Sequence, residues 1–452
     1  MYWRNGAALC ASLFVAVLGG TADAQPAPPA DAAEPAEPAA PAPTEPPAPP
    51  PPAAPEVPTE SVPPAIAAPE PTEGLRLRDV QIHGFASEGG FVSTANNYIG
   101  TSARGSLNLF EAGINFSTEV TDRLRVGMQL FSRDVGDLHD VSPRLDWAFL
   151  DYRWKPWLGL RAGIIRMPLG LYNEYTDIDS ARLPILMPQS IYPLRNRDPL
   201  ISHRGFSLYG NRTLGSAGEL EYQAWLGSLI IPRNALDLIG ATLDDVDTKY
   251  VTGAQVFWHP PVDGLRIGAT VLRASIDFKV TLDPASTMAL IAAGLVPPSF
   301  DGKVTISQRP DTFLVGSAEY IHDDWLFAVE YGRWFKHQQS TLPDLIPAFD
   351  DDAERFYGMV NYQLSPTIQM GGYYSVFNAD ANDRGGHNPK YAERFFAWQR
   401  DLATTIRYDV NDHWLWKVEA HFVDGVADLV SSANPHPERY WGLLLFKTTV
   451  TF

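Results

Sequence analysis

The sequence predicts an all-β chain whose strands close into a transmembrane antiparallel β-barrel of about 16 strands. Three observations predict this fold: strands with alternating polarity, short turns that alternate with long connections, and a C-terminal strand that ends on an aromatic residue. In residues 440–452, Leu444, Phe446 and Phe452 share one face, whereas Lys447 lies on the other. A period of two residues indicates a β-strand, because successive side chains point to opposite sides of a sheet.

Short turns rich in Asp, Asn, Pro and Gly recur between the amphipathic segments, and these residue types tolerate turn geometry. Seven such turns lie at residues 120–123, 154–157, 215–218, 259–264, 322–324, 364–366 and 410–413. They join 14 strands; a strand near residues 79–90 and the C-terminal strand bring the total to about 16. Aromatic residues crowd the turns, as they do at the boundary between membrane and water.

Longer connections separate these tight turns. We expect them at residues 90–107, 134–143, 167–204, 230–248, 276–310, 337–353, 379–396 and 424–438. Alternation of this kind is typical of bacterial membrane barrels, whose short turns face the periplasm and whose long loops face the outside. An open sheet edge in hydrocarbon would leave backbone groups unpaired, so the sheet should close. About 16 strands leave an aqueous channel. A large soluble β-sandwich is the alternative fold.

Residues 1–24 have the pattern of a secretory signal peptide, with a positive charge at Arg4, an apolar stretch and an Ala-Asp-Ala motif ending at Ala24. Cleavage near Ala24–Gln25 would remove Cys10, the only cysteine of the chain. No later segment offers about 18 consecutive apolar residues, so no transmembrane helix is expected. The expected location is the outer membrane of a Gram-negative bacterium, in contact with its lipid.

Residues 25–74 differ from the predicted barrel, residues 75–452. They consist mostly of Pro, Ala and Glu and contain no Lys, Arg or aromatic residue, so we expect a disordered periplasmic leader. It is either a solvated spacer or a tether that contacts cell wall or a partner. The formal net charge of the whole chain is -18, which argues against nucleic acid as a partner, since phosphate contacts need clustered Lys and Arg.

Enzyme motifs are not apparent in the sequence. It contains no H-E-x-x-H, no G-x-S-x-G, no phosphate-binding Gly-rich loop and no cysteine-based metal set. We therefore expect no enzyme, no cofactor and no metal site. A hydrolase whose Ser and His meet across strands is the alternative, because such a site leaves no linear motif.

The chemistry of a channel lies in the side chains that line it. Strand parity assigns charged residues to the interior, because a charge on the lipid face near the midplane costs about 2–4 kcal/mol. The residues assigned to the interior in this way are Glu111, Arg125, Arg133, Arg161, Glu221, Arg266, Glu330, Arg407, Lys417, Glu419 and Lys447.

The third long connection, residues 167–204, is the candidate constriction loop. Its charged candidates are Glu174, Asp177, Asp179, Arg182, Arg195, Arg197, Asp198 and Arg204. The four acidic and four basic residues give this loop no net charge, yet their placement can still create a basic wall. If this part of the loop is extended, Arg195 and Arg197 point the same way. The alternative is that they anchor the loop to Asp198 or to the barrel wall.

Residues 146–152, 160–172, 188–192 and 414–425, together with the final Phe452, resemble Gram-negative porins of the phosphate-selective type. The resemblance implies a channel of sixteen strands, usually trimeric, whose third extracellular loop folds inward to narrow the pore. It also implies that Phe452 is the signal that the barrel-assembly machinery reads. Phosphate-selective members line the pore with clustered basic residues, whereas charges here are mixed, so the resemblance supports a porin rather than phosphate selectivity.

These observations predict a passive, water-filled channel for small hydrophilic solutes or ions, assembled as a homotrimer. Two alternatives remain open at this point. One is a phosphate- or anion-selective channel that depends on Arg195 and Arg197. The other is an envelope-tethering protein in which residues 25–74 bind the cell wall or a partner and the barrel is mainly an anchor.

Overall fold

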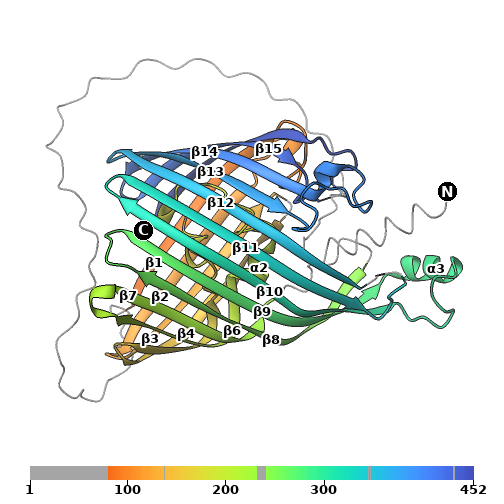
Figure 1. The fold of residues 1–452 in the computed structure, drawn as a ribbon, viewed down its shortest axis with the longest axis horizontal. Helices are drawn as coiled ribbons and strands as arrows, with labels where there is room; N and C mark the ends of the chain where they lie inside the picture. The colour runs from red at the N-terminus through yellow and green to blue at the C-terminus, as the bar shows by residue number, and fades with distance from the viewer. Residues whose placement is uncertain (1–79, 137, 232–240, 345, 347, 431–432) are drawn as a thin grey trace. The chain divides into compact units, whose positions relative to one another are not determined.

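The computed structural model describes residues 80–136, 138–231, 241–344, 346, 348–430 and 433–452. The predicted signal peptide and the Pro-rich leader lie outside the described residues. Sixteen antiparallel strands follow one another in sequence order, each hydrogen-bonded to the next, and β1 pairs with β16 to close the barrel (Figure 1). The prediction of a closed antiparallel barrel is confirmed.

The strands differ in length, and the longest lie in the middle of the chain. The first eight are β1 (Gln81–Ser93), β2 (Leu109–Thr121), β3 (Leu124–Val135), β4 (Leu138–Lys155), β5 (Leu158–Arg166), β6 (Ser202–Thr213), β7 (Glu219–Leu229) and β8 (Ala241–His259). The second eight are β9 (Leu265–Leu282), β10 (Lys303–His322), β11 (Trp325–Ser340), β12 (Phe349–Ser365), β13 (Ile368–Asn378), β14 (Trp398–Asn411), β15 (Trp414–Gly425) and β16 (Tyr440–Thr451).

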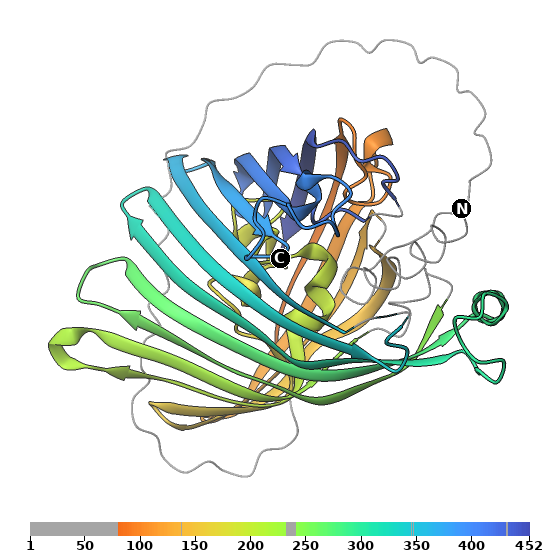
Figure 2. The same ribbon diagram turned by 45° about the vertical axis from the view of Figure 1, so that its right-hand side comes forward.

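All seven predicted tight turns join consecutive strands, from the β2–β3 turn to the β14–β15 turn. They gather at one end of the barrel, and the longer loops gather at the other (Figures 1 and 2). At the turn end the last residue also helps to close the sheet. The backbone N–H of Phe452 donates to the carbonyl of Gly84, and the N–H of Gly84 donates to the carbonyl of Phe452, each at 3.0 Å.

One predicted long connection is wrong. Residues 134–143 were expected to form a loop, yet Val135 of β3 pairs directly with Leu138 of β4. Irregular register between Gln129 and Leu130, and again between Phe131 and Arg133, breaks the alternation that marks a strand in sequence. The hairpin therefore continues through a stretch that does not show a clean period of two.

Strands β8, β9 and β10 have 19, 18 and 20 residues and extend beyond the predicted strand ends. Buried Val280, Val304 and Ile306 stabilise this extension. The connection expected at residues 276–310 is correspondingly shortened, and it carries the helix α3 (Pro284–Ala292). No helix within the described ranges is long and apolar enough to cross a bilayer.

The two faces of the wall differ in polarity. On β15, Val418 and Phe422 are 53% and 63% exposed, whereas Lys417 and Glu419, which point the other way, are buried. The same alternation marks the other strands, which is the pattern of a wall with hydrocarbon outside and polar groups inside. The exposed apolar residues of four further strands include Leu160, Leu226, Ile267 and Ile406.

The largest buried cluster lies inside the barrel rather than between two sheets. Met167, Leu169 and Ile191, from the segment between β5 and β6, pack in one cluster with Phe313 and Tyr357 of the wall. A second cluster packs Ile185 and Leu186 of this segment with wall residues that include Leu109, Leu443 and Leu445. The core is therefore built around one loop.

Candidate functional site

The connection between β5 and β6, residues 167–201, crosses the interior of the barrel. We call it the inner loop. The carboxylate of Glu419 on β15 accepts hydrogen bonds from the backbone N–H groups of Ile185 (2.7 Å) and Leu186 (2.8 Å). Gln255 on β8 donates to the carbonyl of Gly170 at 2.8 Å. Strands β8 and β15 lie on different sides of a closed barrel, so a loop that touches both lies within it.

A buried cluster of charges holds the middle of the inner loop. The Lys417 ammonium lies 3.1 Å from Oδ1 of Asp179 and donates to the carbonyls of Asp179 (2.6 Å) and Arg182 (2.7 Å). Lys447 lies 2.6 Å from Glu111 and 3.5 Å from Asp179. Burial alone would raise the pKa of Asp179, but the charges of Lys417 and Lys447 outweigh it and hold the pKa well below its usual range.

Glu330 of β11 is the second anchor. Its side chain is fully buried and accepts hydrogen bonds from the backbone N–H of Leu171 (2.9 Å) and from the hydroxyls of Tyr192, Tyr357 and Ser317. Carboxylates that receive several donors make strong, directional contacts. Glu330 thus fixes two separate points of the inner loop, Leu171 and Tyr192, against the wall.

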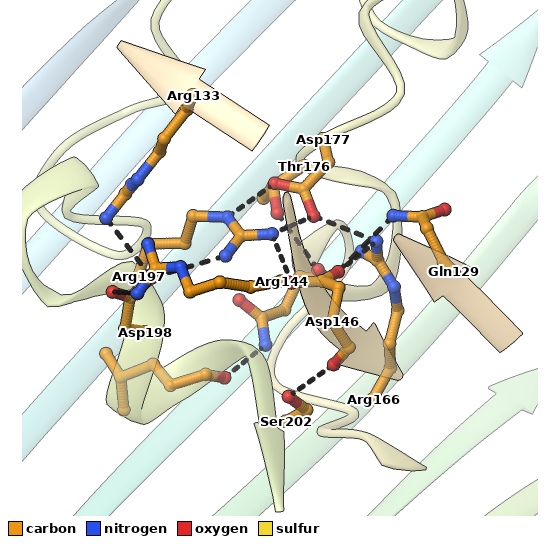
Figure 3. A network of polar contacts seen from close by, with 12 residues as sticks. Gln129, Arg133, Arg144, Asp146, Arg166, Thr176, Asp177, Arg197, Asp198 and Ser202 are labelled. Atoms are coloured by element: carbon orange, nitrogen blue, oxygen red, sulfur yellow. Dashed lines mark hydrogen bonds and ion pairs between the residues drawn. The ribbon is translucent and has the colours of Figure 1, made fainter. Parts of the chain in front are cut away.

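A third network fastens the end of the inner loop near α2 (Arg197–Ile201) to β4 (Figure 3). Arg197 lies 2.8 Å from Asp146 on β4 and 2.6 Å from Asp177 in the loop, and Arg166 bonds both aspartates. Burial raises the pKa of Asp177, but Arg197 and Arg166 together hold it well below its usual range.

Asp198 extends this network to two further arginines. Its carboxylate lies 3.1 Å from Arg133 of β3 and 3.4 Å from Arg144 of β4 (Figure 3). Burial raises the pKa of Asp198, and Arg133, Arg197 and Arg144 outweigh burial, so the pKa is lowered. Fixed charges of both signs therefore hold the loop end against two strands.

The backbone near Arg195 and Arg197 is not extended. Leu194–Asn196 forms a 3-10 helix and α2 follows directly. Arg195 donates to the carbonyl of Tyr98 at 2.6 Å, whereas Arg197 joins the aspartate network. The expectation that both side chains point the same way is therefore wrong, and the placement fits the alternative in which they anchor the loop.

Arg182 and Arg204 also differ from free pore charges. Arg182 donates to carbonyls of the inner loop itself, including that of Thr176 at 2.9 Å. Arg204 belongs to β6 and shares the outward face of Phe206 and Leu208, which are 70% and 40% exposed. Its assignment to the constriction is wrong, because the loop ends at Ile201 and strand parity turns Arg204 outward.

Four of the predicted residues, Arg161, Glu174, Glu221 and Arg266, gather where the inner loop faces strands β5, β7 and β9. Burial raises the pKa of Glu174, and the charges of Arg161 on β5 and then Arg166 oppose this rise. The neighbouring Tyr175 is 51% exposed. The groups that act electrostatically on Tyr175 are Glu174, Arg266, Glu221 and Arg161. The wall here carries β5, β7 and β9, so loop and wall face each other across charges of both signs.

The two arginines of this wall are held in place by carboxylates. Arg161 lies 3.0 Å from Asp151, with its guanidinium 4.2 Å from the centre of the Tyr209 ring. Arg266 lies 2.8 Å from Glu319. Such pairing fixes the position of each guanidinium while leaving part of it exposed. We call Arg161, Glu174, Glu221 and Arg266 the mixed-charge aperture.

Arg407 and Arg125, the remaining candidates, lie apart from this aperture. Arg407 donates to the carbonyl of Ser180 at 2.6 Å and to Asp409 at 2.8 Å, so it is a further loop anchor. Arg125 lies near the turn end of β3 and donates to the hydroxyl of Ser117 at 3.4 Å. It does not contact the inner loop through any hydrogen bond within the described residues.

Sequence reasoning missed several further anchors, both charged and uncharged. Tyr373 donates to the carbonyl of Leu186 at 3.1 Å, and the hydroxyl of Ser375 donates to that of Ser190 at 2.8 Å. Arg355 donates to the carbonyl of Ser190 at 2.6 Å. The signal in the sequence that identifies them is their position on the inward face of β12 and β13.

No family model matches the chain, and no curated protein sequence does. Solved structures with the same fold include Salmonella typhi OmpF in complex with daunomycin, with 12% identity and a TM-score of 0.53 over 82% of this chain and 97% of that one. An anion-selective porin from Comamonas acidovorans has 8% identity and a TM-score of 0.51 over 82% and 99%. OmpT of Vibrio cholerae has 10% identity and a TM-score of 0.50 over 84% and 100%. At these identities the likeness shows that the fold is shared.

Proposed function

We propose that this chain is a porin of the Gram-negative outer membrane, a water-filled channel for the passive diffusion of small hydrophilic solutes or ions. The observation that carries the proposal is the inner loop, which is anchored inside the closed barrel and places Glu174 among the wall charges of Arg161, Glu221 and Arg266. The exposed apolar outer face supports a location in lipid. The fold shared with solved porins supports the same function.

In the proposed mechanism the aperture selects by size and charge. Arg161 and Arg266 on the wall and the carboxylates of Glu174 and Glu221 create an electric field across the path of a solute. Such a field orders water and discriminates between solutes by their charge and dipole. The anchored loop keeps the aperture at one width, because Glu330, Glu419 and Lys417 hold it at separate points.

Planar-bilayer recording of the purified protein tests the proposal. We expect stable, ohmic channels in KCl. Tyr175→Ala, which removes an exposed ring beside the aperture, should raise the single-channel conductance. Tyr374→Ala, at a residue that is 44% exposed on the outward face, is the matched control and should leave conductance unchanged. A folded protein that gives no channels would overturn the proposal.

The chain is proposed to act as a homotrimer, and Glu88 supports an interface between copies. Glu88 lies in the middle of β1 on the outward face, between Ile82 and Val92, and is exposed. Its outward neighbours on β1 are the small residues Gly84, Ala86 and Gly90. A carboxylate facing lipid at this place is unfavourable, whereas a neighbouring subunit can supply hydrogen-bond donors.

Phe452 is proposed as the residue read by the barrel-assembly machinery. Its side chain is 64% exposed, so it is accessible at the edge where β16 meets β1. Deletion of Phe452 should lower the yield of folded barrel in cells. It should lower the refolding yield in detergent by a smaller factor.

Envelope tethering by residues 25–74 is the second candidate function. Deletion of these residues, followed by measurement of envelope integrity, tests it.

A further inference from the structure

Two cations on the inner wall have no carboxylate partner among the described residues. The side-chain ammonium of Lys336 on β11 makes no hydrogen bond or ion pair with any described residue, and it lies 4.8 Å from the ring centre of Trp334. Arg355 of β12 is 6% exposed; one nitrogen donates to Ser190, and its buried Nε has no hydrogen-bond partner. Both face the interior, and Lys336 lies four positions before the loop end of β11.

This situation differs from that of four other inward-facing cations. Arg161, Arg266, Lys417 and Lys447 each have a carboxylate within 3.1 Å. A cation that is withdrawn from water without a counter-ion raises the free energy of the folded state. Lys336 and Arg355 therefore form a place on the inner wall where an anion from solution would lower the free energy of the folded state.

The carboxylates that act on these cations are already engaged with other groups. Asp428 affects both cations electrostatically, and its Oδ2 accepts the Tyr98 hydroxyl at 3.1 Å. Asp311 accepts the backbone N–H of His337 at 3.2 Å, and Asp351 pairs with Lys390 at 3.2 Å. In the described part of the chain, none of these three carboxylates forms an ion pair within 4.0 Å of Lys336 or Arg355.

Aromatic rings surround the two cations. The Arg355 guanidinium carbon lies 4.4 Å from the ring centre of Phe377, 5.2 Å from that of Trp334 and 6.0 Å from that of Phe313. The rings of Trp334 and Phe313 stack, with centres 5.1 Å apart and planes 20° apart. Cations over aromatic faces are stabilised without being neutralised. Apolar planar surface and unneutralised positive charge thus occur together.

We propose that Lys336 and Arg355, with Trp334 and Phe377, form a binding site for aromatic carboxylates. The site lies on the long-loop side of the inner loop. The carboxylate would lie against the Lys336 ammonium, within the field of the Arg355 guanidinium, with the ring against the aromatic side chains. This inference rests on the proposed function, since a solute reaches the site through the open mouth of a channel. It names the solute class that the channel favours.

Single-channel recording with benzoate as the probe tests the inference, and acetate serves as an anion of equal charge without a ring. Benzoate should interrupt the KCl current at concentrations about tenfold lower than acetate, as expected for the added contact between its ring and the aromatic side chains. Lys336→Gln should raise the half-blocking benzoate concentration about tenfold, and Lys336→Arg should retain it.

Arg333→Gln is the matched control. Arg333 lies three positions earlier on the same strand, has the parity of the outward-facing Tyr331 and pairs with Asp352, so its loss should not change the benzoate response. If Lys336→Gln fails to fold, calorimetry of the unmodified protein in detergent tests the site instead. Saturable benzoate binding supports it.

The outcomes separate the two proposals. Normal KCl channels that respond equally to benzoate and acetate, or a Lys336→Gln variant with unchanged block, overturn the aromatic-anion site while the porin proposal stands. Absence of saturable benzoate binding in calorimetry also overturns the site. Absence of KCl channels in folded protein overturns the porin proposal itself.

Discussion

The ammonium of Lys417 lies 3.1 Å from Oδ1 of Asp179, and both side chains are 0% exposed. The contact joins β15 to the short helix Asp179–Ala181 of the inner loop. Removing one partner of a buried ion pair leaves the other charge without compensation, which costs about 3–5 kcal/mol. This pair therefore controls whether the middle of the loop stays in place.

Lys417→Met should loosen the inner loop and leave the barrel closed. We expect a lower unfolding temperature in detergent and noisier, larger single-channel currents, because the cations that remain near Asp179 are more distant, Lys447 at 3.5 Å and Arg182 at 3.7 Å. The double variant Lys417→Met with Asp179→Asn should recover part of the lost stability. Lys303→Met, at a side chain that is 72% exposed, is the control. Quiet currents from Lys417→Met would contradict the anchoring role.

Glu330→Gln should release the first part of the inner loop. The substitution keeps the size of the side chain but removes the charge that four donors share, and hydrogen bonds to charged groups contribute about 1.5–3 kcal/mol each against about 0.5–1.5 for neutral ones. Amide hydrogen exchange at Leu171 should accelerate, because its N–H donates directly to Glu330. The control is Glu119→Gln, at an exposed residue near the β2 turn. Unchanged protection of Leu171 would show that the charge is dispensable.

The fold could be predicted because turn chemistry and strand parity are local properties. Every tight turn carried residues that tolerate turn geometry, and the terminal strand alternated cleanly up to Phe452. The hairpin between Val135 and Leu138 could not be predicted, because register irregularities beside it interrupt the period of two.

Less of the candidate site than of the fold could be predicted from the sequence. Parity placed Glu330 and Glu419 on the inward face, but their partners in the loop lie 159 and 234 positions away along the chain. No local pattern records such contacts. Arg204 was misassigned because the sequence does not show that the loop ends before it. Strand parity also places Arg355 and Lys336 on the inward face.

The charge preference of the channel should change at mildly acidic pH. The pKa of Glu174 is raised because its burial outweighs Arg161 and Arg166, so it binds a proton at higher pH than an ordinary glutamate. As pH falls from 7 to 4, the aperture loses this negative charge and the reversal potential in a KCl gradient should shift toward anions. Glu174→Gln should show a smaller shift, and an undiminished one would contradict the assignment.

The inner loop should stay in place over the same pH range. Asp177 and Asp179 have lowered pKa values, held down against burial by Arg197 and Lys417 respectively. A lowered pKa in the folded state means that their stabilising contribution is present above the unfolded value of about 3.9 and is lost only as pH falls through the folded value. Current noise should therefore remain constant down to pH 4. Increased noise between pH 6 and 4 would indicate that other groups hold the loop.

Glu88 should lie between copies of the chain rather than in lipid. The only cysteine in the sequence is Cys10, within the predicted signal peptide, so Glu88→Cys introduces a single thiol into the processed protein. A short bis-maleimide should then give a band of twice the monomer mass on a denaturing gel. Ile267→Cys is the matched control, because Ile267 is 42% exposed on β9, across the closed strand order from β1, and should give no such band. A Glu88→Cys variant that reacts with a lipid-soluble maleimide but does not cross-link would place this residue in the bilayer and remove the support that it gives to assembly.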